Sequence, residues 1–506
     1  MSENNKLPPV SPVLDLPGHL DGFSLLKPKR ENVDFEEALE ETGFGRYNVI
    51  LILVCGVLLF AANVENYSVG FVVPAAECGL DLDSFKKGLL TSANFVGLVV
   101  SSPLWGYISD IRGRRRLIIT NLCLSFVTGV AAAVTPSFWG FSALRLLNGA
   151  CMAGPGAICF VYLGEFLYAR TRAKSMASTV FFVSLALTHL PALGWLLLQK
   201  TYSLEFLGLR LNNWRTFMLL NSTPGIAVAL ALCWMPESPR YLYYSGRPGD
   251  ALKVLKKMYA TNTGLGEDAF PVRSLDEKVL EAPDASKKAS IWRDLRDQIG
   301  PLFRPPLLTY TLAACSIQAG LFAISSGLFF WYPDIINQVA RSGKESVTVC
   351  EALSAGFETA GESQCSTDVD DRVFILNIVI GAFYGLCFAA WGVLDKMLGT
   401  KKFYISCMVI SAVATALICV VSQKVLIDAF FVSALTISGM CVSIVNCWVV
   451  KIFPTHVAGM ALCVALTAGR LGSLVSSLVA GVMLEWNCTV TIMLYAVNLI
   501  VRFKNE

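Results

Sequence analysis

The sequence is poor in charged residues. Asp, Glu, Lys and Arg make up only 16% of its 506 residues, whereas hydrophobic residues make up 54%. A soluble chain of this length cannot bury so much apolar surface, so the scarcity of charge predicts a polytopic membrane protein in a lipid bilayer. The net charge of +3 is too small to indicate a nucleic-acid partner.

Several signatures of other protein classes are absent from the sequence. It contains no P-loop, so ATP does not drive the protein directly. None of its 16 cysteines belongs to a C-x-x-C pair, and most lie in apolar runs, where a thiol acts as a small hydrophobic group. We therefore expect no metal, no cofactor and no enzymatic activity. The first 45 residues lack an apolar core, which predicts an uncleaved, cytoplasmic amino terminus.

Long apolar runs predict about twelve membrane-spanning helices, because a helix needs roughly 20 mostly apolar residues to cross a bilayer. The expected fold class is therefore an all-α polytopic membrane protein with two six-helix bundles. The last run has only 14 residues, so either it begins earlier or the chain ends prematurely. The expected spans are 47–74, 88–109, 117–135, 138–164, 176–199, 215–235, 307–332, 373–394, 403–422, 425–450, 457–484 and 488–501.

A motif that recurs at a fixed distance indicates an internal duplication. Gly106–Arg116 (GYISDIRGRRR) lies between two apolar runs, and a degraded copy begins 286 residues later at Gly392. Parallel repeats of this kind characterise one large transporter fold. The expected organisation is a cytoplasmic segment 1–46, a bundle 47–235, a cytoplasmic linker 236–306, a bundle 307–501 with an outer loop 334–372, and a cytoplasmic tail 502–506.

The distribution of Lys and Arg predicts the orientation. Arg114, Arg115 and Arg116 follow the second span, and Lys401 and Lys402 follow the eighth, which places these loops and both termini in the cytoplasm. In the linker, residues 250–259 have the pattern of an amphipathic helix. This helix either touches lipid headgroups or packs under the two halves, and we favour the packed position.

Two covalent features are expected on the outer side. Cys350 and Cys365 lie in the polar outer loop, which faces an oxidising compartment, and we expect a disulfide between them. Asn487 begins an Asn-Cys-Thr glycosylation triplet that faces outward, close to the membrane.

Three motifs resemble those of the major facilitator superfamily, and the resemblance covers nearly the whole chain. Gly106–Arg116 is similar to the signature between the second and third helices of that family. Arg145–Gly149 (RLLNG) resembles its fourth-helix motif, and Pro236–Arg240 (PESPR) resembles the sugar-porter signature after the sixth helix. The resemblance implies the twelve-helix major facilitator fold and movement of a solute by alternating access.

Other segments resemble one group within this superfamily. Asp34–Arg46, Ala251–Gly264 and Trp331–Ile336 are similar to the synaptic vesicle glycoprotein 2 and organic-ion-transporter-like proteins. The second half departs from the family pattern, because Lys451 and Ala458 stand where an acidic residue and an arginine are usual. We therefore expect a gating latch dominated by the first half.

The charged motif residues are candidates for this gating latch. A carboxylate such as Asp110 at the end of a helix can pair with the arginines of its own loop and lock the halves in one state. Glu165 and Arg172 suit a second ionic latch, with Arg240 as a third member. The basic residues also set the orientation by the positive-inside rule, which does not compete with a gating role. The candidate gating residues are Asp110, Arg114, Arg115, Glu165, Arg172, Glu237, Arg240 and Asp395.

Polar residues inside membrane spans are costly and therefore mark a candidate solute or ion pathway. Glu65 either binds a cation or a proton, or it pairs with Arg145 or Arg470 across the bundle. The two arginines, in turn, suit an anionic substrate. His189 is either a pH-sensitive group or a packed hydrogen-bond donor. The candidate pathway residues are Asn63, Glu65, Asn66, Arg145, His189, Gln318, Trp331, Asn377, Tyr384, Asn446, Trp448 and Arg470.

Helix spacing also places small residues on one face of the eleventh span. Gly469, Ser473, Ser477 and Gly481 recur every fourth residue, which indicates either close, sliding helix contacts or ordinary tight packing.

Three functions remain open from the sequence. The first is a secondary transporter or facilitator of a small organic solute, with an organic ion favoured and proton coupling through Glu65 as one form of it. The second is a transporter-like vesicle or surface protein that acts mainly by binding partners, an alternative supported by Lys451 and Ala458. The third is a facilitative sugar carrier, supported by Pro236–Arg240 and Gln318. The protein is expected in the plasma membrane or in an intracellular vesicle membrane.

Overall fold

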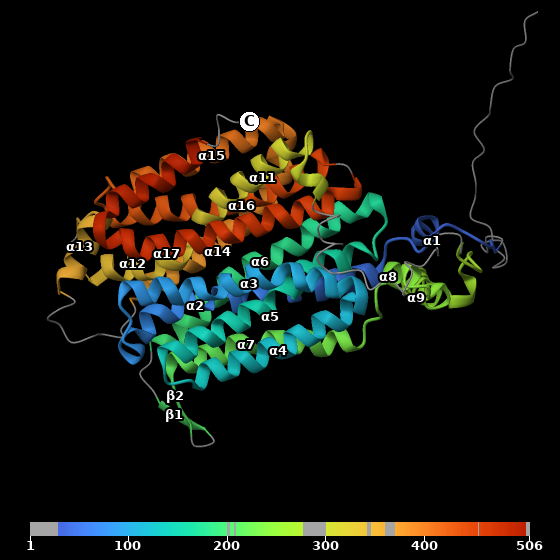
Figure 1. Cartoon of the computed structure of the whole chain (residues 1–506), viewed down its shortest axis with the longest axis horizontal. Helices are drawn as coiled ribbons and strands as arrows, with labels where there is room; N and C mark the ends of the chain where they lie inside the picture. The colour runs from blue at the N-terminus through green and yellow to red at the C-terminus, as the bar shows by residue number, and fades with distance from the viewer. Residues whose placement is uncertain are drawn as a thin grey trace, which may run out of the picture.

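The fold consists almost entirely of long helices that run side by side along the longest axis of the molecule (Figure 1). The computed structural model describes residues 29–199, 203–206, 209–276, 300–341, 346–359, 370–453 and 455–501. Apolar side chains cover these helices, and each helix satisfies its backbone hydrogen bonds internally, as a lipid environment requires.

The first half supplies six of these long helices, which occupy the lower part of Figure 1. Between α6 and α7, a short antiparallel hairpin pairs Ser203 with Asn212 and Phe206 with Leu209, an element that the apolar pattern did not predict. The elements of this half are α2 (Arg46–Leu80), α3 (Ser84–Arg112), α4 (Arg114–Val134), α5 (Phe138–Gly164), α6 (Ala169–Leu198), β1 (Ser203–Phe206), β2 (Leu209–Asn212) and α7 (Asn213–Cys233).

The second half lies above the first in Figure 1 and is also helical. Its first span combines α11, η3 and α12 into one continuous path. The elements of this half are η2 (Gly300–Phe303), α11 (Leu307–Phe322), η3 (Ala323–Leu328), α12 (Phe329–Arg341), α13 (Val349–Thr359), α14 (Asp371–Leu398), α15 (Thr400–Leu417), α16 (Lys424–Ile452) and α17 (Thr455–Val501).

Twelve spans are present, as the sequence predicts. Ten helices in the described part of the chain are long and apolar enough to cross a membrane. The shorter α15 is another span, and a non-helical Asn487 divides α17 into the last two. The last helix therefore begins after Asn487, at the position expected from the sequence. Part of the outer loop 334–372 is helical, since α12 continues to Arg341 and α13 spans Val349–Thr359.

The internal repeat is visible in the backbone. Gly113 separates α3 from α4 with a φ of +96°, and Gly399 separates α14 from α15 with a φ of +79°. Residues with a β-carbon rarely adopt such positive φ angles, so glycine is favoured at both turns. The offset found in the sequence therefore corresponds to the same sharp helix connection in each half.

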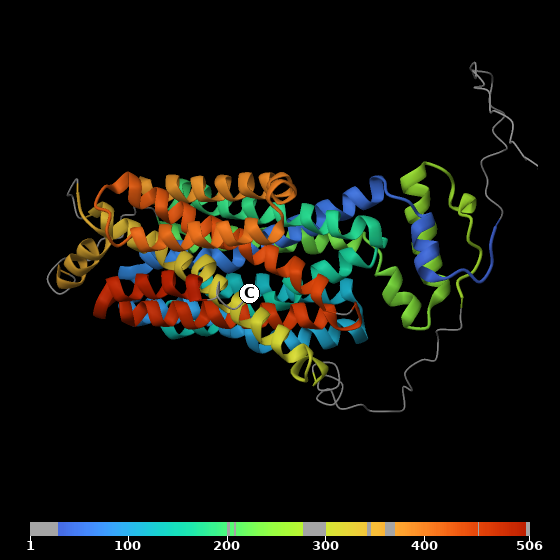
Figure 2. The same ribbon diagram turned by 90° about the horizontal axis from the view of Figure 1, so that it is seen from above.

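A small cap of helices covers one end of the first half. It contains α1 (Phe35–Glu41), α8 (Pro239–Tyr244), α9 (Pro248–Thr263) and η1 (Glu267–Ala269), which lie at the right of Figures 1 and 2. The amphipathic helix expected over 250–259 is α9, and its buried side chains include Leu255 and Met258. The described contacts of α9 are with α1, α8, η1 and α2, so it packs under the first half and not under both halves.

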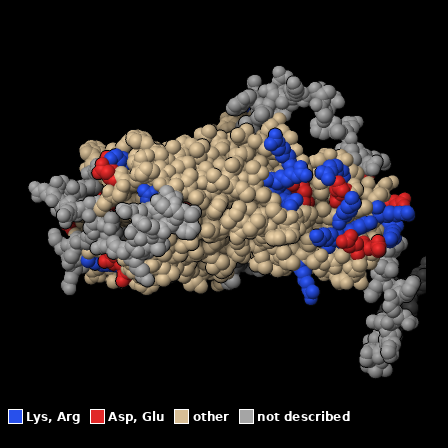
Figure 3. Space-filling model, turned by 90° about the horizontal axis from the view of Figure 1, so that it is seen from below, with Lys and Arg blue, Asp and Glu red and all other residues tan. Residues whose placement is uncertain are grey.

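Charged residues gather at the ends of the molecule. Figure 3 shows Lys, Arg, Asp and Glu concentrated at the end with the cap and sparse along the middle of the face in view. This distribution suits a protein whose middle is surrounded by lipid, because ionised side chains are expensive there. We call the end with α1, α8 and α9 the linker end, and the opposite end, near α13, the α13 end.

Candidate solute pathway and gating residues

Glu65 and Arg145 form an ion pair inside the first half. The two side chains come from α2 and α5 and are 2% and 0% exposed. Arg145 Nη1 lies 2.9 Å from Glu65 Oε1, and Nη2 donates to the Glu65 carbonyl oxygen at 2.7 Å. The hydroxyl of Ser222 on α7 donates to the other carboxylate oxygen. Of the alternatives for Glu65, the geometry matches pairing with Arg145, which neutralises both charges within one bundle.

Arg470 lies where the two halves meet. Its guanidinium on α17 donates to the hydroxyl of Ser102 on α3. In the part of the chain that the structure describes, no carboxylate forms an ion pair with Arg470. Tyr67 and Ser326 share a hydrogen bond of 3.2 Å between the same two halves. Arg470 is therefore a partly buried cation whose described hydrogen-bond partner is neutral.

Aromatic side chains surround Tyr67. Its ring centroid lies 5.4 Å from that of Phe329 and 5.5 Å from that of Phe330, and Phe95 packs edge-on against Phe330. These rings come from α2, α3 and α12, so both halves contribute to the aromatic cluster.

The other candidate pathway residues form local contacts. Asn63 donates to the Leu59 carbonyl oxygen, and Asn66 accepts from Asn94. The His189 ring packs beside Phe60 at 5.2 Å. In the second half, Gln318 donates to Asn446 at 2.6 Å, Asn377 donates to the Val373 carbonyl, Tyr384 approaches the Gly439 carbonyl, and Trp448 packs on Tyr404. The structure thus joins Gln318 directly to Asn446.

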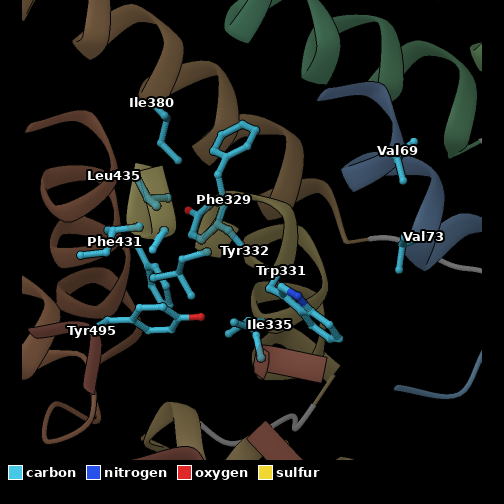
Figure 4. Packing of buried hydrophobic residues seen from close by; sticks show 14 of the residues in the cluster. Val69, Val73, Phe329, Trp331, Tyr332, Ile335, Ile380, Phe431, Leu435 and Tyr495 are labelled. Carbon is cyan, nitrogen blue, oxygen red and sulfur yellow. The ribbon is translucent and has the colours of Figure 1, made fainter. Parts of the chain in front are cut away.

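Trp331 lies in the packed core near the α13 end. Figure 4 shows Trp331 with Tyr332, Ile335 and other apolar side chains of the second half, while Val69 and Val73 of α2 lie across from it. The indole is 4% exposed and donates to the Ser477 carbonyl oxygen. Its surroundings are those of a packing residue where helices of the two halves meet.

Arg114 is the centre of the charged cluster at the linker end. Its Nη2 lies 2.8 Å from Asp110 Oδ1 and 3.1 Å from Glu165 Oε1, so one guanidinium binds carboxylates that follow α5 and end α3. Its guanidinium also lies 5.0 Å from the centre of the Tyr241 ring. Burial raises the pKa of Glu165 above its ordinary value, although Arg114 opposes this effect. The cluster ties helices of the first half to one another.

Arg115 binds the segment that follows α7. Its backbone N–H donates to Glu237 at 2.9 Å, and its side chain donates to the carbonyl oxygens of Leu232 and Cys233. Glu237 also accepts from the Ser238 backbone, which joins α4 to the start of α8.

The expected latch of Glu165, Arg172 and Arg240 has different partners. Glu165 binds Arg114, whereas Glu36 of α1 lies 2.6 Å from Arg240 and 3.9 Å from Arg172. The sequence analysis missed Glu36 because the contact joins residues 204 positions apart, from Glu36 to Arg240. Its position in the family-like segment 34–46 was the available signal. Of the second-half candidates, the side chains of Asp395, Lys451 and Ala458 lie outside the described part of the structure.

The expected disulfide between Cys350 and Cys365 is wrong. Cys350 on α13 is bonded to Cys488, and their Cα atoms are 5.4 Å apart. Cys365 lies outside the described residues, and Cys78 is disulfide-bonded as well. The prediction failed because Cys488 begins an apolar run and lies outside the polar outer loop. Folding brings α13 against the last helix, so Cys350 meets Cys488. Asn487 is exposed and caps that helix by accepting from the Val490 backbone, so its glycosylation stays a prediction.

Three charged residues at the α13 end were also missed. Lys87 on α3 lies 3.1 Å from Glu77 on α2 and 3.1 Å from Asp334 on α12. Lys87 lies at the edge of an apolar run, and a lysine at such a position is expected from the sequence to lie at the membrane surface. Asp334 belongs to the family-like segment Trp331–Ile336, which was the only hint of its importance.

Comparisons with known proteins agree with this architecture. Synaptic vesicle glycoprotein 2A from Homo sapiens is 28% identical over 329 residues, which are 60% of this chain and only 44% of that protein. Synaptic vesicle 2-related protein from Xenopus laevis is 27% identical over 508 residues, covering 96% of this chain and 83% of that protein.

Solved structures share the fold at low sequence identity. The partially occluded inward-open conformation of the xylose transporter XylE from E. coli matches with a TM-score of 0.63 and 15% identity, covering 90% of this chain and 98% of that chain. Its inward-open conformation matches with a TM-score of 0.61, also at 15% identity, covering 91% and 95%. The family model described as Major Facilitator Superfamily matches residues 53–359, and the chain therefore belongs to the major facilitator superfamily as a multi-pass membrane protein.

Proposed function

We propose that this protein is a secondary transporter of a small organic anion, which binds between the two halves next to Arg470. In this proposal, the bundles 47–235 and 307–501 rock about the site and expose it alternately at the two ends. Membership of the superfamily and the two-bundle fold support the class of activity. The linker end faces the cytoplasm by the positive-inside rule, and the protein resides in a plasma or vesicle membrane.

The observation that carries the choice of an anion is the environment of Arg470. A buried charge without an opposite charge is costly, and an arginine guanidinium binds carboxylates through a planar fork of donors. Arg145 has Glu65 as its counter-ion, whereas the described hydrogen-bond partner of Arg470 is the Ser102 hydroxyl. An anionic solute would supply the missing charge, and the rings of Tyr67, Phe329 and Phe330 would contact its apolar part.

The contacts of Glu65 favour a structural role. Its carboxylate binds Arg145 and Ser222 within the first half, so a proton or cation would have to displace a buried partner. The proposal therefore assigns no coupling proton to Glu65, and it leaves the ion gradient that drives transport to be measured.

Competition binding to the purified protein tests the proposal. A panel of aromatic monocarboxylates, organic cations and sugars competes against a labelled monocarboxylate, and only the anions should compete. Arg470→Met and Arg470→Lys should each weaken anion binding at least about tenfold, because lysine keeps the charge but loses the fork of donors. Arg116→Gln is the matched control, since its exposed side chain lies at the linker end.

Two outcomes of the same competition panel would contradict the proposal. Competition by cations alone would rule out an anionic solute. Unchanged anion affinity in folded Arg470→Met would rule out a binding role for Arg470. Absence of binding by every class would favour the alternative in which the protein acts mainly through binding partners.

A second candidate, a hydroxylated solute such as a sugar, is favoured by one observation. Gln318 is buried, and its side-chain oxygen has no hydrogen-bond partner among the described groups, while its amide nitrogen binds Asn446. Paired amides of this kind can bind hydroxyl groups. If sugars compete and Gln318→Leu abolishes that competition while Arg470→Met does not, the sugar carrier replaces the anion transporter.

A further inference from the structure

Lys87 connects the two halves at the α13 end. Its side chain is 7% exposed and lies 3.1 Å from Asp334, whose side chain is 5% exposed. Lys87 belongs to α3 of the first half, and Asp334 belongs to α12 of the second half. Each of these charges also has a polar partner in its own half, because Glu77 binds Lys87 at 3.1 Å and Gln338 donates to Asp334 at 3.0 Å.

The ion pair lies beside a close contact between α3 and α17. A β-carbon on Gly88 would stand 3.3 Å from the Ser477 carbonyl oxygen and 3.4 Å from the Gly481 Cα, so the two backbones nearly touch. One turn further along α3, Thr91 and Ser477 share a hydrogen bond of 2.6 Å. The Trp331 indole covers this contact and binds the Ser477 carbonyl oxygen. Ser477 is fully buried, so the α13 end is closed here.

The partners of Lys87 and Asp334 make their separation reversible. Removing both partners from a buried charge is strongly unfavourable, whereas a charge that keeps one partner loses much less. If the halves part at the α13 end, Lys87 keeps Glu77 and Asp334 keeps Gln338. The ion pair can therefore exist in two states, joined or separated, and neither state leaves a charge without a polar partner. An alternating gate requires two such states.

We propose that the Lys87–Asp334 ion pair is the gate that closes the α13 end, with Glu77 and Gln338 as the partners that hold the two charges when the gate is open. The inference rests on the alternating opening in the proposed function but not on the nature of the solute. Its test measures the opening of the α13 end directly and needs no transport.

The test is labelling of Ser477→Cys with a water-soluble maleimide in purified, detergent-solubilised protein. Ser477 is buried behind the gate, so its replacement should react slowly in the parent background. Adding Asp334→Asn or Lys87→Met should raise the labelling rate at least about tenfold, because the open state becomes more populated. The same variants without Ser477→Cys measure the background from the native cysteines.

Asp428→Asn is the matched control. Asp428 pairs with Arg372, but both belong to the second half, on α16 and α14. Breaking this pair should leave labelling of Ser477→Cys unchanged. Equal increases in Asp428→Asn and Asp334→Asn would show general loosening and overturn the gate.

A charge exchange keeps the proposal falsifiable if single variants fold poorly. Lys87→Asp combined with Asp334→Lys, in a Glu77→Gln background that avoids two adjacent carboxylates, restores the pair across the halves, and labelling should return to within about threefold of the Glu77→Gln rate. Unchanged labelling in folded Asp334→Asn, or continued fast labelling in the exchanged variant, overturns the proposal. Since no solute is present, either result is distinguishable from a failure of the anion hypothesis, which binding alone tests.

Discussion

Individual charges acquire their meaning from partners that are distant in the sequence. Glu65, Arg145 and Arg470 look alike in the sequence, because each is an ionisable residue inside a membrane span, and few pairings among them are possible. In the structure, Glu65 and Arg145 neutralise each other, while Arg470 faces a hydroxyl group. The first two are therefore predicted to matter for stability and the third for binding.

Loss of one partner of the Glu65–Arg145 pair should destabilise the protein. Arg145→Met leaves a buried carboxylate, and Glu65→Gln leaves a buried guanidinium, so each should lower the free energy of unfolding by about 3 to 5 kcal/mol. Replacing both, as Glu65→Leu with Arg145→Met, should recover most of this loss. Denaturant titration of the purified variants in detergent measures the free energy of unfolding.

The exposed pair of Arg30 and Glu37 provides the control for this prediction. Glu37 is half exposed, so Glu37→Gln should cost no more than about 1 kcal/mol. If Glu65→Gln were as stable as the parent, the structural role of Glu65 would be wrong, and a titrating role would regain support.

At the scale of elements, the two sharp helix connections show how the repeat has diverged. A β-carbon at Gly113 would stand 2.6 Å from Glu237 Oε2 and 3.2 Å from the Tyr241 ring, whereas none of the described atoms lies within 4 Å at Gly399. The backbone turn is thus common to both halves, and in the first half Glu237 and Tyr241 pack closely against it. The expected dominance of the first half in the latch and its gating role stay predictions.

Alanine at the two glycines should separate backbone strain from packing. Gly399→Ala imposes only the unfavourable backbone angle, which costs about 1 to 3 kcal/mol. Gly113→Ala should cost more than this, because the added methyl group also displaces Glu237 from the Arg115 backbone. Thermal unfolding of both variants measures the difference, and equal losses would contradict the asymmetry.

On the scale of the whole molecule, the disulfide between Cys350 and Cys488 joins segments that are 138 residues apart. It fastens α13 to the start of the last helix, at the end where the halves are closed. Since such a bond restricts the unfolded chain, its removal is expected to be costly even in a protein with a large apolar core.

Cys350→Ser and Cys488→Ser should each lower the free energy of unfolding by about 2 to 4 kcal/mol, and the double variant should lose no more than either. A reductant should destabilise the parent but neither variant by this route. Cys315→Ser is the control, because Cys315 is a free thiol. Additive losses in the double variant would contradict the bond.

The sequence by itself determined the class of fold, the spans and the repeat, because apolar length and glycine turns are local properties that any bilayer protein must satisfy. It also identified Arg114, Glu165 and Arg470 as residues to examine. Only the tertiary structure decided the partners: Glu65 with Arg145, Glu36 with Arg240, Lys87 with Asp334, and Cys350 with Cys488. Each of these contacts joins distant segments, and their pairing depends on helix packing, which spacing along one chain does not specify.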